Sequence, residues 1–178
     1  MKHATLVSLA VAMLSGCQSV RPPITTAGQV DLPRFMGDWY VIANIPTFIE
    51  KHAYGAVESY RLDSDGTIDT TFTFSKGSFD GPKKRYNPRG FVFDKRSNAV
   101  WGMRFVWPIK ADYRIVYVSS DYSRTIIGRE ARDYVWIMAR TPTIADSDYR
   151  QLLELVQREG YDSSQVRKVP QRSTGPGQ

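Results

Sequence analysis

Short runs in which apolar and polar residues alternate fill most of this chain and limit its fold more than any other feature. Side chains of a β-strand point to opposite faces in turn, so a period of two predicts strands. The runs cover residues 39–44, 54–62, 67–75, 90–93, 100–106, 113–119, 124–128 and 134–139. Turn-forming residues separate them, as in Asp63-Ser64-Asp65-Gly66. These eight segments predict an all-β protein, an eight-stranded up-and-down antiparallel β-barrel, which leaves no unpaired strand edge.

One segment has a helical period instead. Tyr149, Leu152, Leu153 and Val156 are spaced at i, i+3, i+4 and i+7, which predicts an amphipathic α-helix that begins near Asp146. Gly160 ends the pattern. Its apolar stripe needs a partner, and we expect this single C-terminal helix to pack on the outer wall of the barrel. Residues 165–169 are expected to add a short outer strand.

The first residues have the pattern of an export signal, with a basic start and an apolar run, 4–14, too short to span a bilayer. The string Leu14-Ser15-Gly16-Cys17 resembles the lipobox of bacterial lipoproteins, in which the cysteine thiol is acylated. We therefore expect residues 1–16 to form a lipoprotein signal peptide, 17–31 a lipidated tether, 32–170 the folded domain and 171–178 a flexible tail. An ordinary secretory signal followed by an incidental cysteine is the alternative.

The lipoprotein resemblance implies attachment to a membrane through acyl chains on Cys17. Gln18 follows that cysteine, where an Asp would favour retention in the inner membrane, so the bacterial outer membrane is expected, with the periplasmic face favoured. Because Cys17 is the only cysteine, the chain has no internal disulfide and no cysteine cluster for zinc. Packing alone must stabilise the domain.

Composition and motifs argue against several classes of function. The net charge of +6 is mild, and no dense basic stripe predicts nucleic-acid binding. No Gly-x-Ser-x-Gly motif, phosphate-binding loop or histidine-rich metal spacing is present. We therefore expect a protein that is not an enzyme and that has no metal and no cofactor. Both a monomer and a homodimer fit the sequence.

Three short strings resemble motifs of the lipocalin family. They are Gly37-Asp38-Trp39-Tyr40 at the start of the first strand, Ala111-Asp112-Tyr113 before a late strand, and Arg140 at the end of the last strand. Residues 132–142, with Gly160-Tyr161 further on, are similar to bacterial outer-membrane lipocalins and to their relatives apolipoprotein D and the plant temperature-induced lipocalins. The resemblance implies a lipocalin (calycin) barrel whose closed end holds Gly37, Trp39, Tyr40, Asp112, Tyr113 and Arg140. It further implies that Arg140 lies across the Trp39 ring, a role in the fold and not in chemistry.

The other end of such a barrel is open, and alternation predicts which residues face its interior. If Arg140 points inward, every second residue before it on that strand does so too. The inward faces are expected to be rich in rings and to form a cavity suited to an elongated apolar guest. The predicted cavity residues are Glu58, Phe72, Phe74, Phe91, Phe93, Trp101, Met103, Phe105, Trp107, Tyr134, Trp136 and Met138. Rings that simply fill a small barrel are the alternative.

Glu58 is the exception on these faces. Its register places a carboxyl group inside, which is costly unless the group is paired or protonated. A local bulge that turns it outward is equally compatible with the sequence.

Basic residues gather in the loops expected at the open end. The predicted rim cations are Lys51, Lys83, Lys84, Arg85, Lys110 and Arg132. Such a rim suits a carboxylate or phosphate headgroup whose tail enters the cavity. Ordinary solvated loop charge is the alternative.

Taken together, the sequence predicts a lipid-anchored lipocalin that binds fatty acids, lysophospholipids or similar amphiphiles. Storage, transport or repair of lipids in the bacterial envelope would be its purpose. An enzyme acting on a lipid inside the same barrel, and an envelope interaction protein with a filled barrel, stay open as alternatives.

Overall fold

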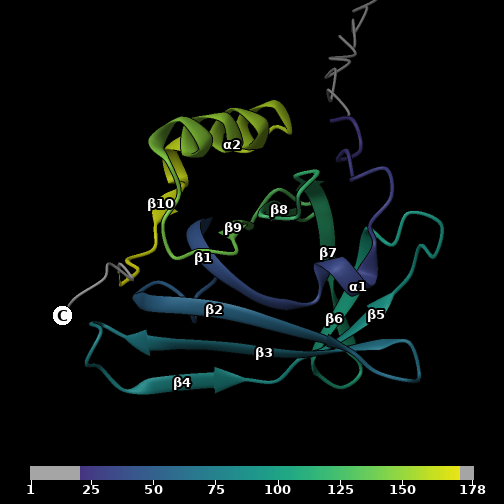
Figure 1. Cartoon of the computed structure of the whole chain (residues 1–178), viewed down its shortest axis with the longest axis horizontal. Coiled ribbons are helices and arrows are strands. Elements are labelled where there is room, and N and C mark those ends of the chain that lie inside the picture. Colours follow the sequence, from purple (N-terminus) through teal and green to yellow (C-terminus); the bar gives the residue numbers. More distant parts are fainter. Residues whose placement is uncertain (1–20, 173–178) are drawn as a thin grey trace, which may run out of the picture.

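A computed structural model describes residues 21–172 as a closed antiparallel barrel (Figure 1). Its strands are β1 (Gly37–Ile45), β2 (Ala53–Leu62), β3 (Thr67–Lys76), β4 (Lys83–Tyr86), β5 (Arg89–Val92), β6 (Val100–Val106), β7 (Ile109–Val118), β8 (Arg124–Gly128) and β9 (Val135–Ala139). Consecutive strands pair from β1 to β3 and from β5 to β9, β3 also pairs with β5, and β9 returns to pair with β1. Both β4 and β5 pair with β3 and share one place in the barrel, which therefore has eight positions. The predicted eight-stranded barrel is confirmed, although β4 lies where a loop was expected.

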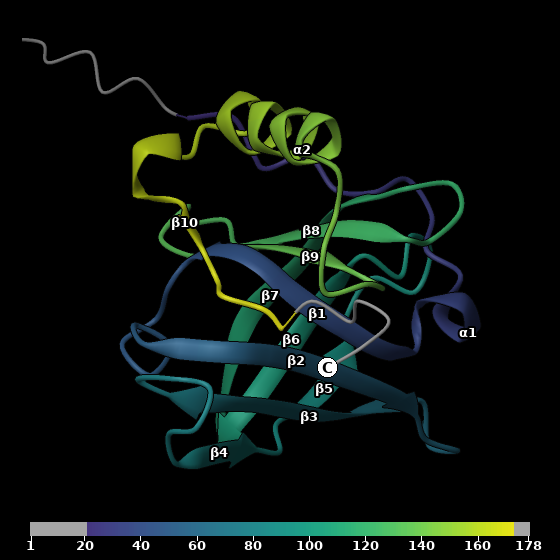
Figure 2. The same cartoon turned by 60° about the vertical axis from the view of Figure 1, so that its left-hand side comes forward.

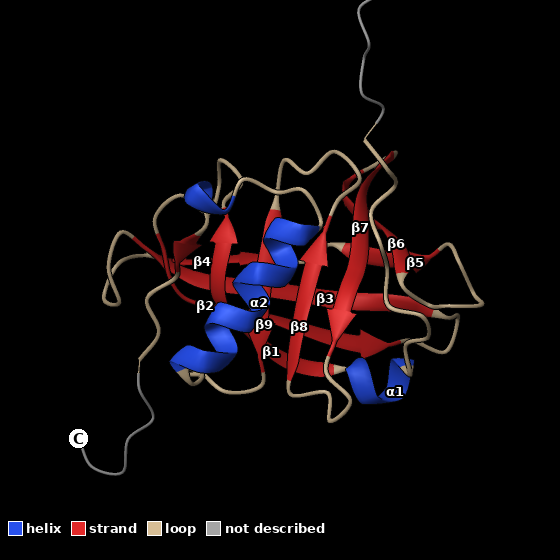
Figure 3. Cartoon of the chain, turned by 90° about the horizontal axis from the view of Figure 1, so that it is seen from above, coloured by secondary structure: helices blue, strands red, loops and turns tan. Residues whose placement is uncertain are grey.

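The C-terminal helix is also confirmed. Helix α2 (Asp146–Arg158) lies across the outer face of β8 and β9 (Figure 3). Its buried Leu152 and Val156 pack in one cluster with Val135 and Ile137 of β9. The 3-10 helix η1 (Ser163–Gln165) and the short strand β10 (Arg167–Lys168) follow, and β10 pairs with β1 on the outside of the barrel. This buried face fixes the helix to the wall and leaves the barrel interior free.

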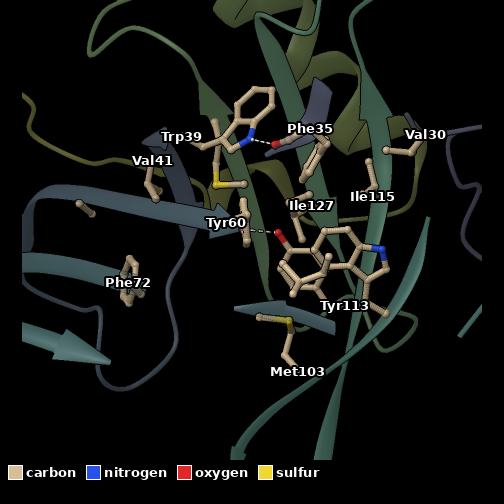
Figure 4. Close-up of a cluster of buried hydrophobic side chains, with 14 of the residues drawn as sticks. Val30, Phe35, Trp39, Val41, Tyr60, Phe72, Met103, Tyr113, Ile115 and Ile127 are labelled. Atoms are coloured by element: carbon tan, nitrogen blue, oxygen red, sulfur yellow. Dashed lines mark hydrogen bonds between the residues drawn. The ribbon is translucent and has the colours of Figure 1, made fainter. Parts of the chain in front are cut away.

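One end of the barrel is closed by helix α1 (Leu32–Phe35) and the side chains beneath it. The guanidinium carbon of Arg140 lies 3.8 Å from the centre of the Trp39 ring, and Trp39 donates a hydrogen bond to the main-chain oxygen of Phe35 (Figure 4). Arg140 also donates to the main-chain oxygens of Asp38 and Arg34, each at 2.8 Å. These bonds connect α1, β1 and β9, so the closed end is held by one cation and its carbonyl partners.

The Asp-Tyr pair at this closed end is Asp121-Tyr122, and the expectation that Asp112-Tyr113 lies there is wrong. Tyr122 is in the turn between β7 and β8; its main-chain oxygen accepts from Arg140 and its ring lies 4.1 Å from the Arg34 guanidinium. Asp112 lies nearer the opposite end of β7, where it accepts a hydrogen bond from the main-chain nitrogen of Glu130. The sequence contains both pairs, and only the direction of β7 distinguishes them.

The N-terminal segment 21–31, which we call the strap, packs along the outside of the barrel instead of forming a loose tether. The main-chain nitrogens of Val30 and Ala27 donate hydrogen bonds to the main-chain oxygens of Ser97, at the closed end, and Ile115 of β7. The main-chain nitrogen of Ile24 donates to the Glu130 carboxylate. Ile24 and Val30 are buried. The strap therefore runs from α1 to the opposite end of the barrel, alongside α2 (Figure 2).

The predicted signal peptide, Cys17 and most of the predicted tail lie outside the described residues. Gln171, the first residue of that tail, donates to the main-chain oxygens of Val41 and Ala56. Among residues 21–172 no helix is both long and apolar enough to cross a membrane.

Candidate functional site

The barrel end opposite α1 holds a cavity of about 510 Å³. The loop after β1 contributes Phe48 and Ile49 to its wall, and the end of β6 contributes Phe105 and Val106. Deeper in, Phe72 of β3 and Met103 of β6 face it. The volume lies in the range of small-molecule sites, and the apolar walls suit a hydrocarbon chain.

Half of the predicted cavity residues line this space. They are Glu58, Phe72, Met103, Phe105, Tyr134 and Trp136. Tyr86 of β4 completes the wall, because its ring stacks on Phe72 and Phe74 at centroid distances of 6.4 and 6.2 Å. Sequence reasoning missed Tyr86 because residues 76–89 lack a sustained alternation, a pattern that predicts a loop.

Three predicted cavity residues are instead part of the packed core. Trp101 and Met138 are fully buried, Phe74 nearly so, and all three belong to the core cluster beneath the cavity. The Trp101 ring stacks on Tyr113 at 5.4 Å and meets Phe35 edge-on at 5.7 Å. Their inward orientation is as expected, but they fill the lower barrel and do not line the cavity.

Phe91, Phe93 and Trp107 do not face the interior, and this part of the prediction is wrong. In the β3–β5 pairing Gly90 lies opposite Ile68, and cross-strand partners share a face. Ile68 is fully buried, so Gly90 faces inward and its neighbour Phe91 faces outward. Phe93 follows Phe91 on that outer face and Trp107 lies beyond the end of β6; their exposed fractions are 57% and 78%.

Glu58 faces the cavity with its carboxyl group hydrogen-bonded by the Tyr60 hydroxyl. That hydroxyl also contacts the hydroxyl of Tyr113 (Figure 4). Burial raises the pKa of Glu58 to about 7, and the charge of Glu50 adds to the rise, while the bond from Tyr60 lowers it. The sequence is compatible with either direction for Glu58; the structure turns it inward and gives it a partner.

Arg129 is the cationic side chain that lines the cavity within the described part of the chain. Its guanidinium lies 5.3 Å from the Tyr134 ring and donates to Asp133 at 3.0 Å. Its Nε is buried and, among the described residues, has no hydrogen-bond partner. Glu50 also lines the cavity, but it accepts from Trp136 Nε1 at 2.8 Å and from Thr47. Arg129 therefore supplies the positive charge at the cavity wall, with Asp133 as its partner, whereas the Glu50 carboxylate is held by Trp136 and Thr47.

None of the predicted rim cations lines the cavity. Lys51 and Arg85 are exposed, Lys83 is exposed and donates to Ser75, and Lys84 is half-buried on β4. Lys110 lies on the outer face, with Nζ 3.9 Å from the centre of the Phe91 ring.

Arg132 is not a rim cation, and that expectation is wrong. Its side chain is only 4% exposed and donates to the main-chain oxygens of Pro22 and Glu159 at 2.8 and 3.1 Å. It joins the strap to the end of α2 and is not available to a ligand.

The open end of the barrel combines an apolar wall with few polar groups. Residues 21–172 contain no group of three His, Cys, Asp or Glu side chains placed to hold a metal ion. A barrel shut at one end, with an apolar cavity and a few polar groups at the other, has the form of a protein that encloses a ligand.

Comparison with known proteins gives the family. A family model described as "Lipocalin-like domain" matches residues 30–171. Temperature-induced lipocalin-1 of Arabidopsis thaliana is 32% identical over 159 residues, covering 83% of this chain and 82% of the relative. Outer membrane lipoprotein Blc of Escherichia coli (strain K12) is 27% identical over 185 residues, covering 96% of this chain and 98% of the relative. The chain belongs to the lipocalin family, whose members generally bind ligands and do not catalyse reactions.

Solved structures agree with the fold. Insecticyanin from the tobacco hornworm Manduca sexta superposes with a TM-score of 0.64 at 13% identity, covering 85% of this chain and 86% of that chain. At that identity the likeness supports the barrel architecture alone.

Proposed function

We propose that this lipocalin is anchored to the bacterial outer membrane through an acylated Cys17 and binds fatty acids, lysophospholipids or similar amphiphiles. The cavity carries the proposal. Its apolar walls would bury the tail, at roughly 25 cal/mol for each Å² removed from water. The Arg129 guanidinium, which lines the cavity, would bind a carboxylate or phosphate headgroup through its positive charge.

The anchor and the location rest on the sequence and on relatives. The string Leu14–Cys17 resembles a lipobox, and several relatives are named outer membrane lipoprotein Blc. Storage, transport or repair of envelope lipids is the purpose we propose for such a carrier.

Native mass spectrometry of the chain from Gln18 onward, incubated with oleic acid or a lysophosphatidylethanolamine, tests the binding. We expect one amphiphile bound per barrel. A protein that stays ligand-free at saturating amphiphile would favour the filled-barrel interaction protein, and steady turnover of the lysolipid to new products would favour the enzyme.

A matched pair of variants locates the site. Phe105 lines the cavity and Phe93 lies on the outer face, yet the exposed fractions of the two rings are similar, 53% and 57%. Because a carboxylate in the wall opposes entry of a hydrocarbon tail, Phe105→Asp should weaken amphiphile binding at least about ten-fold by calorimetry. Phe93→Asp should leave the affinity unchanged. Equal affinities in the two variants would contradict the assignment of the cavity as the binding site.

A further inference from the structure

Large apolar side chains lie exposed around the cavity mouth. Residues 105–110, which we call the tip, join β6 to β7 and are all exposed. Trp107 is 78% exposed, Ile109 70% and Val106 69%, and Phe48 of the loop after β1 is 81% exposed. We call these four side chains the mouth patch. Phe48 and Val106 both line the cavity, so the patch borders its opening.

Packing and ligand binding do not account for two members of this patch, Trp107 and Ile109. Trp107 and Ile109 neither line the cavity nor join either core cluster. Exposed apolar groups gathered beside a site mark a surface that meets another apolar phase or partner. Tryptophan in particular suits a boundary between water and hydrocarbon, because its ring is apolar and its N–H is polar.

The charges that flank the patch along the chain are positive. Arg104 precedes the tip and Lys110 ends it, both beside the Phe91 ring on the outer wall, and residues 104–110 contain no acidic side chain. In the loop after β1, Lys51 is exposed, while Glu50 is buried and bonded to Trp136 and Thr47. Apolar side chains with flanking cations fit a bilayer that contains anionic lipid.

The strap brings the chain's N-terminal side to the same end of the barrel. Arg132, in the loop between β8 and β9 at the open end, donates to the main-chain oxygen of Pro22. The side chain of Arg21 lies close to Gly160, just beyond the end of α2. The strap therefore leaves the barrel on the side of the cavity mouth and not on the side of α1.

We propose that the mouth patch docks the barrel, open end first, on the surface of an anionic bilayer. Trp107 and Ile109 enter the interface, and Arg104, Lys110 and Lys51 contact lipid headgroups. An amphiphile then passes between bilayer and cavity without crossing bulk water. That purpose rests on the proposed function, but docking is tested separately from ligand binding.

The chain from Gln18 onward tests docking without any acyl anchor, and it retains every residue whose contacts the structure describes. The probe is vesicles of phosphatidylethanolamine and phosphatidylglycerol, compared with vesicles of phosphatidylcholine alone. We expect co-sedimentation with the anionic vesicles, weakened by salt because screening acts on exposed charge. Trp39 and Trp101 are fully buried and Trp136 is half-buried, so a blue shift of tryptophan emission on docking reports chiefly on Trp107.

Substitutions at the two ends of the barrel separate docking from general stickiness. Ile109→Ser and Trp107→Ser should each weaken vesicle binding at least about five-fold, since each removes one apolar side chain from the interface. Leu62→Ser is the control at the closed end, because Leu62 is a 38% exposed aliphatic residue at the end of β2 that shares a surface pocket with Leu32 of α1. It should bind vesicles as the parent chain does.

Three outcomes would overturn the docking proposal. Equal binding by Ile109→Ser and Leu62→Ser would place docking elsewhere. Equal binding to phosphatidylcholine vesicles would remove the role of the cations. A dimer in solution that Ile109→Ser dissociates, without vesicle binding, would make a second copy the partner. Neither Trp107 nor Ile109 lines the cavity, so both variants should bind oleic acid in solution as tightly as the parent chain does. If the parent chain itself does not bind oleic acid, that result would count against the proposed function and not against docking.

Discussion

At the scale of single residues, Glu58 is the group whose ionisation matters most. It lies at the cavity wall, bonded by the Tyr60 hydroxyl, with Glu50 as the like charge that affects its pKa. Because its pKa rises from 4.5 to about 7 on folding, the folded state holds a proton that the unfolded chain has already lost between those values. The free energy of unfolding therefore falls as pH rises through this window. Above about pH 7 the buried Glu58 carboxylate is ionised, and its full destabilising effect on the fold is present.

Glu58→Gln removes this pH dependence and keeps an oxygen that accepts from Tyr60. We expect the variant to match the parent chain at pH 4.5 and to be more stable at pH 8, by at most about 3 kcal/mol and less where cavity water screens the charge. Urea unfolding at both pH values measures it. A variant that is equally stable relative to the parent at both pH values would contradict the raised pKa.

At the scale of elements, alternation predicts strands well but does not say which face is inside. The two phenylalanines of segment 90–93 suggest that Phe91 and Phe93 face inward. The pairing of Gly90 with Ile68 instead places Gly90 inward and the phenylalanines outward. The glycine is inward because space there is short: a Cβ at Gly90 would come within 3.1 Å of both Ile68 and Met103. Such a constraint arises between strands distant in sequence, so it is not visible in the local pattern.

The same reason explains the misplaced Asp-Tyr pair and the missed β4. Asp112-Tyr113 and Asp121-Tyr122 are alike in sequence, and the course of β7 decides which one reaches Arg140. By contrast, the resemblance to lipocalins was enough to place Trp39 and Arg140 together at the closed end, where the structure has them in contact. Arg129, the cation of the cavity, is one of many loop cations in the sequence, and only the fold selects it.

Helix α2 offers a test of packing at this scale. Leu152 is buried against β9, whereas Leu153, included in the predicted stripe, is only half-buried and lies outside that cluster. Leu152→Ala should therefore lower the free energy of unfolding by about 2–4 kcal/mol, and Leu153→Ala by clearly less. Denaturant unfolding of both variants measures this, and equal losses would contradict the packing of the helix. Amphiphile affinity of the folded protein should be retained in both, because α2 does not line the cavity.

At the scale of the whole molecule, the strap relates the proposed anchor to the cavity. Arg21 lies near Gly160 at the open side, and it is four residues from Cys17. Four residues span at most about 14 Å, so acyl chains on Cys17 would keep the open end close to the bilayer. A flexible tether from Cys17 to residue 31 would leave the orientation of the barrel relative to the bilayer free. A tether that ends at Arg21 is shorter and restricts that orientation.

Lengthening this connection tests the relation between anchor and mouth. A flexible Gly-Ser insert of about 20 residues between Val20 and Arg21 adds a root-mean-square reach of roughly 25 Å. In phosphatidylcholine vesicles, where the anchor acts without anionic lipid, acrylamide should quench Trp107 more strongly in the extended protein than in the parent. The same insert after Arg172 is the control and should leave quenching unchanged.

Metabolic labelling tests the premise that Cys17 is acylated, since Cys17→Ser should abolish palmitate incorporation. Equal quenching with and without the N-terminal insert would mean that the strap does not hold the mouth toward the membrane, and docking would then depend on the mouth patch alone.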